Sequence, residues 1–488
     1  MQRLAGRQLW LAIGSTVAWF GLCILLYRYF YPVSPSLMPL IPLGLLCVLA
    51  AVYHFEGFLF TMVGLVPLSI NIIDIGGGVG LALPGEALLM ISAAGFITLI
   101  LRGQLNPIPL LRHPIGLVII VQMAWVVVSL LASSYTEIST KFLLARCVYI
   151  LVYFLGFGSI FMNPDRIVSF FKAYIWGMVP VSIYAIYVLW MLGMSRNSSP
   201  VMAEPFFDDH TVFGNCLAMI LPVAIWIAAR DRMGGKRSRF NWGWSVVVLL
   251  SVALLLSFSR AAWMALVVMA VMWLILRLRI RFRFFAAALV VLAAGIWISR
   301  DALVKRFEEN ENVSGEDVFS TAASVTNVNS DDSNKERINR WACAIRMFEE
   351  RPWFGFGPGT YEKNYGDYQV LAQLTRISSF HGDRGDAHSE YLGALSEQGL
   401  PGMLLLGGLF LMTLRIGMRV VYRTQDAKVR GIATAVLLGL SSFYFHGFVN
   451  DFYDLDKAAC LIWSMMAVLA ALDLRERGAG RQEPQVKS

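Results

Sequence analysis

Long apolar runs separated by short polar connections make up most of the chain. Fourteen of them approach the roughly 20 residues that an α-helix needs to cross a bilayer. They fall near residues 9–30, 37–54, 57–73, 85–101, 115–133, 140–162, 168–193, 210–229, 242–258, 261–276, 284–299, 400–420, 430–447 and 457–472. The pattern predicts an all-α polytopic membrane protein with about fourteen transmembrane helices. The run at 9–30 lacks a small-residue cleavage site, so we interpret it as a first spanning helix and not a removed signal peptide.

One long polar segment, residues 300–388, interrupts this pattern. It divides the chain into eleven predicted spans (1–299), a large loop with its following motif (300–399), and three spans with a basic tail (400–488). Within the loop, apolar residues recur at helical spacing and predict an amphipathic helix that Pro352 ends: Ile338, Trp341, Ala342, Ile345 and Phe348. The next residues, 353–359, read Trp-Phe-Gly-Phe-Gly-Pro-Gly, a turn whose glycines allow a ligand to approach the backbone closely.

The stretch from Asp386 to Gly402 predicts a short helix at the start of the next span. Asp386 is the expected N-cap, Gly399 the expected end, and Pro401 suits the first turn of the following helix. His388 then falls in the first turn, where free N–H groups favour an anion. Glu390 and Glu397 lie two turns apart on one face. The alternative is an interfacial helix whose histidine is merely solvated.

Composition and charge support the membrane class. Hydrophobic residues make up 57% of the chain and charged residues 15%, whereas soluble domains carry about 25% charged residues. The cysteine pattern implies no disulfide framework. More than half of the Lys and Arg residues fall in the connections that are cytoplasmic if the N-terminus is cytoplasmic. The net charge of +8 therefore reports orientation, and no nucleic-acid partner is expected.

Several charged side chains lie on the predicted outer face, where an intramembrane or rim charge is a candidate for function. Arg260 occupies a tight corner between two spans, in Ser257-Phe-Ser-Arg-Ala261. The other candidates are Lys141, Arg146, the Asp208-Asp209-His210 segment and Arg384. Arginine forks match diphosphate oxygens. Snorkelling is the alternative for Lys141 and Arg146, and helix capping for Asp209 and His210. A metal site at His381, Asp383, Asp386 and His388 matches no strong ligand signature, so we expect no metal.

The chain resembles the O-antigen ligase and O-antigen polymerase superfamily. The residues that carry this resemblance are Arg340-Trp341, Pro352 with the glycine-rich turn, His388 through Glu397-Gln-Gly-Leu-Pro-Gly402, and the corner at Arg260. The resemblance implies a metal-independent, inverting glycosyltransferase of the GT-C type without a cofactor. Such an enzyme takes a glycan from undecaprenyl diphosphate at the periplasmic face of the bacterial inner membrane and attaches it to a glycan or lipid-linked acceptor. Whether the chain is a polymerase or a ligase stays open.

The resemblance also implies roles for particular residues. His388 matches the loop histidine proposed to take the acceptor proton, and Arg260 matches the arginine that holds the donor diphosphate. A neutral histidine suits a base at neutral pH, and arginines stabilise a diphosphate leaving group. The expected substrate-binding residues are Arg384, Arg146, Lys141, Arg340, His210, Asp209, Glu390 and Glu397.

Two other classes compete with an enzyme. A flippase for lipid-linked oligosaccharides can also have fourteen spans, but it is expected to carry internal repeats and polar residues near mid-membrane. The charges of this chain gather instead at the outer rim. The third possibility is a scaffold whose loop binds a partner. The pattern of charges therefore favours an enzyme.

Overall fold

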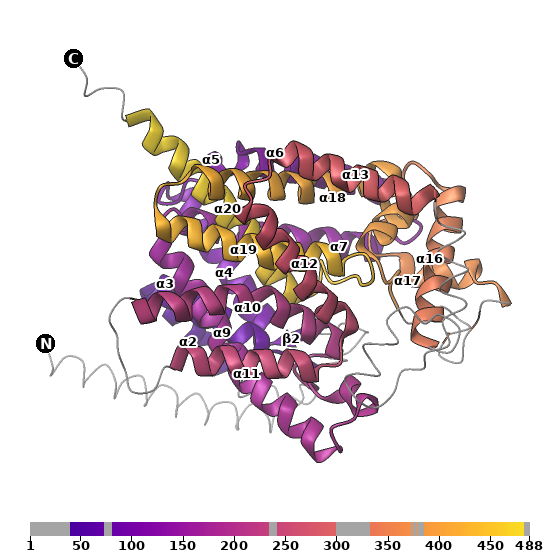
Figure 1. The fold of residues 1–488 in the computed structure, drawn as a ribbon, viewed down its shortest axis with the longest axis horizontal. Helices are drawn as coiled ribbons and strands as arrows, with labels where there is room; N and C mark the ends of the chain where they lie inside the picture. Colours follow the sequence, from indigo (N-terminus) through magenta and orange to yellow (C-terminus); the bar gives the residue numbers. More distant parts are fainter. Residues whose placement is uncertain are drawn as a thin grey trace, which may run out of the picture.

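A computed structural model describes residues 40–72, 81–233, 242–298, 332–371, 374, 378 and 385–482 (Figure 1). The predicted span at 9–30, the first part of the polar loop, and His381, Asp383 and Arg384 lie outside the described residues. The helices before the loop are α2 (Leu40–Tyr53), α3 (Phe55–Leu65), α4 (Gly85–Leu101), α5 (Ile108–Leu111), α6 (Pro114–Leu131), α7 (Thr136–Tyr149), α8 (Phe157–Ile160), α9 (Pro164–Met191), α10 (His210–Met233), α11 (Trp242–Leu256), α12 (Arg260–Arg277) and α13 (Phe282–Ile298). They are followed by α16 (Asp332–Glu350), α17 (Tyr361–Asn364), α18 (Glu390–Arg423), α19 (Ala427–His446) and α20 (Asp456–Gln482).

Seven helical stretches in the described part of the chain are long and apolar enough to cross a membrane. They are Pro114–Leu131, Thr136–Ile160, Pro164–Met191, His210–Arg232, Arg260–Arg277, Glu390–Arg423 and Asp456–Gly478. The stretch Thr136–Ile160 joins α7 to α8 through a π-helical segment, Ile150–Gly156. Shorter apolar helices occupy Phe55–Leu68, Gly85–Leu101 and Trp242–Leu256. The chain is therefore an all-α, multi-pass membrane protein, while the total of fourteen spans stays a prediction.

Local capping explains where many helices begin. Asn163 accepts a hydrogen bond from the N–H of Asp165 at 3.0 Å, and Pro164 fills the first helical position of α9. In α19, Asp426 accepts from Lys428 N at 2.8 Å. Each cap satisfies a backbone donor that the helix itself leaves unpaired. These short polar signals lie at the ends of the apolar runs, which is why the predicted boundaries fall within a few residues of the observed ones.

The predicted span at 57–73 is wrong at its C-terminal end. Helix α3 stops at Leu65, a 3₁₀ turn follows at Val66–Leu68, and Ile70–Ile72 forms strand β1. This strand pairs antiparallel with β2 (Leu81–Leu83), so that Ile70 faces Leu83. Pro67 explains the break, because proline inside a helix loses a hydrogen bond and clashes with the preceding turn.

The predicted helix at 386–399 exists, but it begins later than expected. Ser389 is the N-cap, and its side chain accepts from Leu392 N at 3.4 Å, so His388 lies before the first turn and not within it. Asp386 accepts instead from His388 N at 2.8 Å, in a local turn. Gly399 has φ of 70°, which interrupts α18 as expected. His388 therefore lies directly before the helix N-terminus, outside its first turn.

Helix α16 occupies the predicted place, but the apolar residues predicted to recur along it are partly exposed. Ile338 and Ile345 are 41% and 43% exposed, whereas Cys343 and Met347 are fully buried. The buried side packs against Phe356, Tyr361 and Tyr365. Aromatic residues of the following loop supply the apolar partner here, and the sequence period alone did not specify which stripe they would cover.

Close backbone approach holds the bundle together in its interior. A Cβ at Gly177 of α9 would meet Gly64 O of α3 at 2.1 Å, and a Cβ at Gly439 of α19 would meet Met219 O of α10 at 2.4 Å. Small residues at such crossings let membrane helices pack by van der Waals contact. Helix α20 runs through this interior, and 94% of its apolar 18-residue stretch is buried.

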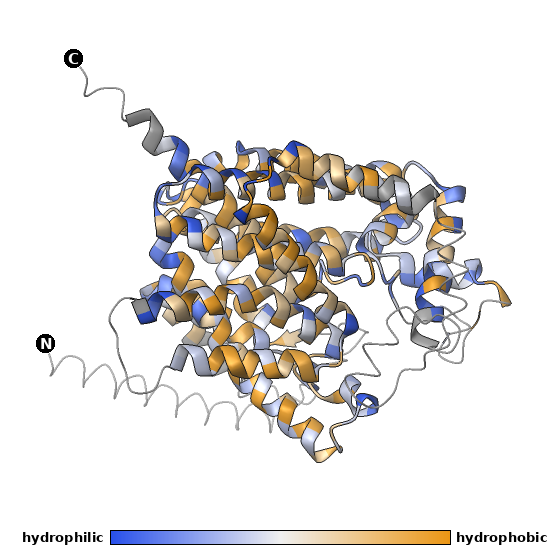
Figure 2. Cartoon of the chain, in the orientation of Figure 1, coloured by the Kyte–Doolittle hydropathy of each residue, from blue (hydrophilic) through white to orange (hydrophobic). Residues whose placement is uncertain are grey.

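The bundle has two polar ends. One end, here named the loop face, carries residues 131–136, 257–260, 332–371, 385–390 and 447–456. Contacts join these segments: Ser134 N donates to Phe356 O at 2.9 Å, and Arg337 Nε donates to Val449 O at 3.3 Å. Figure 2 shows hydrophilic residues over α16 and α17 and at the opposite end, with apolar residues along the helices between them.

The opposite end, here named the basic face, carries most of the arginines of the described spans. Asp473 is its centre: Arg419 Nε and Arg477 Nε contact its carboxylate at 2.9 and 2.7 Å, and His113 Nε2 lies 3.1 Å away. The site described below is at the loop face, on the other end of the same helices.

Candidate active site

The glycine-rich turn docks onto the first part of α18. Gly357 N donates to Glu397 O at 2.9 Å, and Leu400 N donates to Pro352 O at 2.9 Å. Gly355 has φ of 67°, and a Cβ there would meet the backbone of Glu397 at 2.2 Å. The glycines thus allow two protein backbones to approach each other. We had expected the close approach to be to a ligand.

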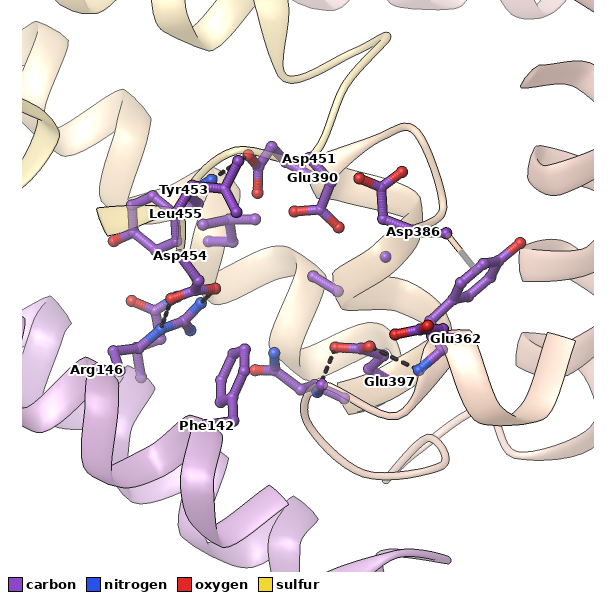
Figure 3. Close-up of a pocket in the computed structure, with 18 residues that line it drawn as sticks. Phe142, Arg146, Glu362, Asp386, Glu390, Glu397, Asp451, Tyr453, Asp454 and Leu455 are labelled. Atoms are coloured by element: carbon purple, nitrogen blue, oxygen red, sulfur yellow. Dashed lines mark hydrogen bonds and ion pairs between the residues drawn. The ribbon is translucent and has the colours of Figure 1, made fainter. Parts of the chain in front are cut away.

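Glu397 fastens this turn through its side chain. Its carboxylate accepts from Gly359 N and from Tyr361 N, each at 2.8 Å (Figure 3). The glycine-rich turn is therefore held to the end of the short helix by hydrogen bonds to both the main chain and the side chain of Glu397.

Glu390 fastens the connection between α19 and α20 in the same way, through its side chain. Its Oε1 accepts from Phe452 N at 2.5 Å and from Tyr453 N at 2.7 Å, and its backbone N–H donates to Gly447 O at 2.9 Å. The short helix therefore joins the two loops, one at each end. As predicted, Glu390 and Glu397 lie on one face, since both line the same cavity.

That cavity has a volume of about 280 Å³ and opens at the loop face. Six carboxyl groups line it: Glu362, Asp386, Glu390, Glu397, Asp451 and Asp454. Of the described lining residues, one is an arginine, Arg146. Figure 3 shows these side chains arranged around the cavity, with Arg146 and Asp454 on one side and Glu397 and Glu362 on the other.

Arg146 is neutralised by the protein itself. Its Nε donates to Asp454 Oδ1 at 2.9 Å, and its Nη2 contacts the other oxygen of the same carboxylate. The guanidinium also lies 4.3 Å from the ring centre of Phe142 and 4.9 Å from that of Tyr453. Bidentate pairing and ring stacking are the geometry that arginine favours, so this side chain is fixed in place by residues of α7 and of the α19–α20 connection.

Some of the lining carboxyl groups lie outside the membrane-spanning helices. Among these, Asp451 has the environment that most disfavours ionisation. Burial and the nearby charge of Asp386 raise its pKa to about 7, and it shares a hydrogen bond with Glu390. Two neighbouring carboxyl groups that share a proton cannot both ionise at neutral pH without a large cost.

His388 lies beside the cavity, next to one of its lining carboxylates. Its Nδ1 is 3.0 Å from Asp386 Oδ1, and its side chain is 30% exposed. Burial opposes ionisation of Asp386, but the hydrogen bonds from His388 and the charge of Arg340 outweigh it and lower the pKa. A carboxylate partner at Nδ1 selects the tautomer in which Nε2 carries the lone pair.

The backbone around His388 is held in an uncommon conformation. His388 has φ of 47°, a region that costs a non-glycine residue free energy and occurs often at functional sites. Two residues of α16 hold it: Trp341 Nε1 donates to His388 O at 3.1 Å, and Arg340 Nη1 donates to Asp386 O at 3.0 Å. Arg340 also pairs with Glu336 at 2.9 Å. The motif Arg340-Trp341 therefore positions the turn that carries His388.

The described lining does not include Lys141, Asp209, His210 or Arg260. Lys141 pairs with Glu137 at 2.9 Å on the outside of α7, with 62% of its side chain exposed. His210 pairs with Asp209 at 2.9 Å, and Asp209 accepts from Thr211 N at 2.8 Å, which is a capping arrangement at the start of α10. Arg260 begins α12, next to its N-cap Ser259.

Asp451 and Asp454 are the residues that sequence reasoning missed. They lie in Asn450-Asp-Phe-Tyr-Asp454, a short connection between two predicted spans. The available sequence signal was a short connection, predicted to lie on the outer face, that holds two carboxylates beside aromatic residues. The loop at 300–388 gave the stronger sequence signal for a site, because it is much longer than this connection.

Comparison with known families agrees with this geometry. Residues 245–407 match the family described as O-antigen ligase. The matched region begins in α11, contains Arg260, the glycine-rich turn and His388, and ends within α18. No curated protein matches the chain. This match, in the region that carries the motifs described above, supports membership of the O-antigen ligase and polymerase superfamily, whose members take part in polysaccharide biosynthesis.

Proposed function

We propose that the protein transfers a glycan from undecaprenyl diphosphate to a hydroxyl group of an acceptor sugar at the loop face. The observation that carries this proposal is the pair His388 and Asp386 beside a cavity at the rim of the bundle. The family match supports the same reaction class. The loop face is the periplasmic one in this proposal, since the opposite end is the basic face and basic residues favour the cytoplasm.

The reaction requires a base and a stabilised leaving group. In the proposed step, His388 Nε2 takes the proton of the acceptor hydroxyl while its oxygen attacks the anomeric carbon. The bond from that carbon to the diphosphate oxygen breaks, and the lipid diphosphate leaves with the electron pair. Asp386 stabilises the imidazolium that forms, as a carboxylate does in other His–carboxylate pairs. Attack from the side opposite the leaving group inverts the anomeric configuration.

The diphosphate is assigned to two arginines, Arg260 and Arg384. Arg146 and Arg340 contact the protein's own carboxylates, Asp454 and Glu336. We assign donor binding to Arg260, at the start of α12, because it matches the corner arginine of the family, and to Arg384, four residues before His388 in the chain. Bidentate guanidinium groups suit the charged non-bridging oxygens of the diphosphate leaving group.

The experiment uses purified protein in lipid nanodiscs, supplied with an undecaprenyl-diphosphate-linked glycan and an acceptor. We expect a longer glycan or a glycosylated lipid acceptor together with free undecaprenyl diphosphate. Two variants sharpen the test: Arg260→Ala is expected to abolish transfer, and Arg260→Lys to recover little of it, because a point charge lacks the guanidinium fork. The control is Lys363→Ala, an exposed cation of α17. Full transfer by Arg260→Ala would remove the diphosphate assignment.

A further inference from the structure

A second cavity, here named the apolar groove, lies between α10, α12 and α19 at the end of the bundle that carries the basic face (Figure 1). Its lining on α10 and α12 ends at Trp226 and Trp273, within two turns of the ends of these helices, and its lining on α19 begins at the first helical residue, Ala427. Asp426, the cap of α19, lies 3.9 Å from Arg475, which follows the centre of the basic face by two residues. The groove is therefore far from the candidate active site, which is at the loop face.

The groove has the length of one leaflet of a bilayer. Its lining on α19 extends from Ala427 to Leu438, which is about 17 Å of helix at a rise of 1.5 Å per residue. The hydrocarbon core of a bilayer is about 30 Å thick, so this length covers about half of it. Ile225 and Trp273 of the lining are 40% and 47% exposed. Since α10 and α12 are long and apolar enough to span a membrane, the open side of the groove faces lipid.

The chemistry of the lining changes along this length. Apart from Arg430 and Thr434, the described lining residues are apolar, and the volume of the groove is about 590 Å³, a size typical of ligand sites. Arg430 lies in the first turn of α19, at the end of the groove that meets the basic face. The groove thus offers a long apolar slot with a cation at one end.

Two further arginines lie at the same end, each over a tryptophan of the lining. The guanidinium of Arg230 is 5.6 Å from the ring centre of Trp226, and that of Arg277 is 5.3 Å from the ring centre of Trp273. Arg230 also lies 3.9 Å from Asp165. Tryptophan and arginine gather at the level of the lipid headgroups in membrane proteins, so these pairs mark that level here.

The positive charge at this end is available to a ligand. Arg430 Nη2 donates to the neutral backbone oxygen of Thr424 at 2.7 Å. Among the described residues, no carboxylate forms an ion pair with Arg430 or Arg277. Guanidinium groups match the oxygens of a phosphate, and basic pockets between membrane-spanning helices at the cytoplasmic side are typical sites for anionic lipid headgroups.

We propose that the apolar groove binds one anionic phospholipid of the leaflet at the basic face. An acyl chain lies between α10, α12 and α19, and the phosphate lies at Arg430 and Arg277. This site goes beyond the proposed glycan transfer and does not depend on it. The competing occupant is the polyprenyl chain of a lipid-linked glycan, which would need the apolar lining but not the arginines.

The experiment titrates the purified full-length protein in detergent with phosphatidylglycerol or phosphatidylethanolamine of the same acyl chains, and native mass spectrometry counts the bound lipids. We expect phosphatidylglycerol to bind at least about 5-fold more tightly, the contribution of about one arginine near a lipid surface. Equal affinities overturn the proposal. Displacement of bound phosphatidylglycerol by uncharged undecaprenol, to the same extent in the wild type and in Arg430→Gln, would assign the groove to a polyprenyl chain and also overturn it.

Variants of the cations test the headgroup end. Arg430→Gln should reduce the preference for phosphatidylglycerol by about 5-fold. Arg277→Gln should act in the same direction at the exposed last residue of α12, where folding is not at risk. The matched control is Arg102→Gln, an exposed arginine that follows α4, outside the groove. An equal loss of preference in the control would mean that surface charge as a whole, and not the groove, selects the lipid.

A volume variant tests the apolar end. Ala270 of α12 lines the groove and is exposed, so Ala270→Phe fills part of the slot without a change of charge. It should weaken binding of both lipids by at least about 10-fold, the contribution of about two buried methylene groups. Val267→Phe, at a residue of the same helix that is 55% exposed and outside the described lining, is the matched control. Unchanged binding by Ala270→Phe would show that the lipid lies elsewhere.

Discussion

Arg146 of α7 binds Asp454, a residue 308 positions later in the chain, through two atoms of its guanidinium group. The arginine side chain is 4% exposed and the aspartate side chain 32%. Removing one member of such a pair leaves a charge without its partner, which is more costly than replacing both.

We therefore expect Arg146→Gln to lower the free energy of unfolding by about 3 kcal/mol, the low end for buried pairs because Asp454 keeps some solvent. The double variant with Asp454→Asn should recover part of that loss, because no unpaired charge then remains. Unfolding of the detergent-purified proteins gives the free energy of unfolding of each single variant and of the double variant. Strict additivity of the two single effects would mean that the pair makes no coupled contribution.

Replacing His388 by alanine should reduce the rate of glycan transfer by about 10²–10⁴-fold, the usual share of a general base. Donor binding should remain, since the diphosphate is assigned to other residues. Asp386→Asn should reduce the rate as well, because it no longer fixes the tautomer or stabilises the imidazolium. Turnover and donor binding are measured separately. The matched control is His54→Ala, an exposed histidine between α2 and α3. Wild-type turnover by His388→Ala would end its assignment as the base.

The raised pKa of Asp451 predicts a pH dependence of stability. The folded protein keeps a proton on this carboxyl up to about pH 7, while the unfolded chain releases it near its ordinary pKa of about 3.9. Between these values the folded state binds more protons, so stability falls as the pH rises, by at most about 1.4 kcal/mol per pH unit for this group. Asp386, whose pKa is lowered, contributes the opposite slope only below about pH 4.

Asp451→Asn should flatten that decline, since an amide does not titrate. Thermal unfolding between pH 4.5 and 8 gives the slope for both proteins. Parallel curves would show that the carboxyl is ionised throughout this range.

Two glycines of α18 provide a paired test of the kink. Gly399 has φ of 70°, and a Cβ there would meet Trp353 O at 2.2 Å, whereas a Cβ at Gly407 would meet no atom within 4 Å. Gly399→Ala should cost at least about 1–2 kcal/mol from the left-handed conformation alone, and transfer should fall with it. Gly407→Ala should be neutral or stabilise by up to about 1 kcal/mol, the helix propensity difference. Equal effects of the two variants would contradict a strained, closely packed kink.

The helices were the most predictable part of the molecule, because their signals are local. Pro164 behind Asn163, and Gly399 before Pro401, define ends whatever the rest of the chain does. The N-cap of α18 was mispredicted because Asp386 and Ser389 are both good capping residues three positions apart. Only the turn at His388 decides between them, and α16 holds that turn through Trp341.

The site was less predictable because contacts between distant segments create it. His388 and Glu390 could be found from their motif. Asp451 and Asp454 could not, since their role depends on Glu390 and Arg146, which are distant in sequence. The exposed position of Lys141 likewise follows from the rotation of α7, which no pattern in the apolar run determines.

The short helix at the start of α18 has a consequence for how the site comes apart. The carboxyl groups of Glu390 and Glu397 each accept two hydrogen bonds from the backbone amides of a different loop, so opening either loop leaves a carboxyl group of the same helix without these donors. Free energy for opening either loop then approaches that for opening both, which is the condition for a single cooperative unit. The loop face is thus expected to melt as one foldon, separate from the helices that anchor it.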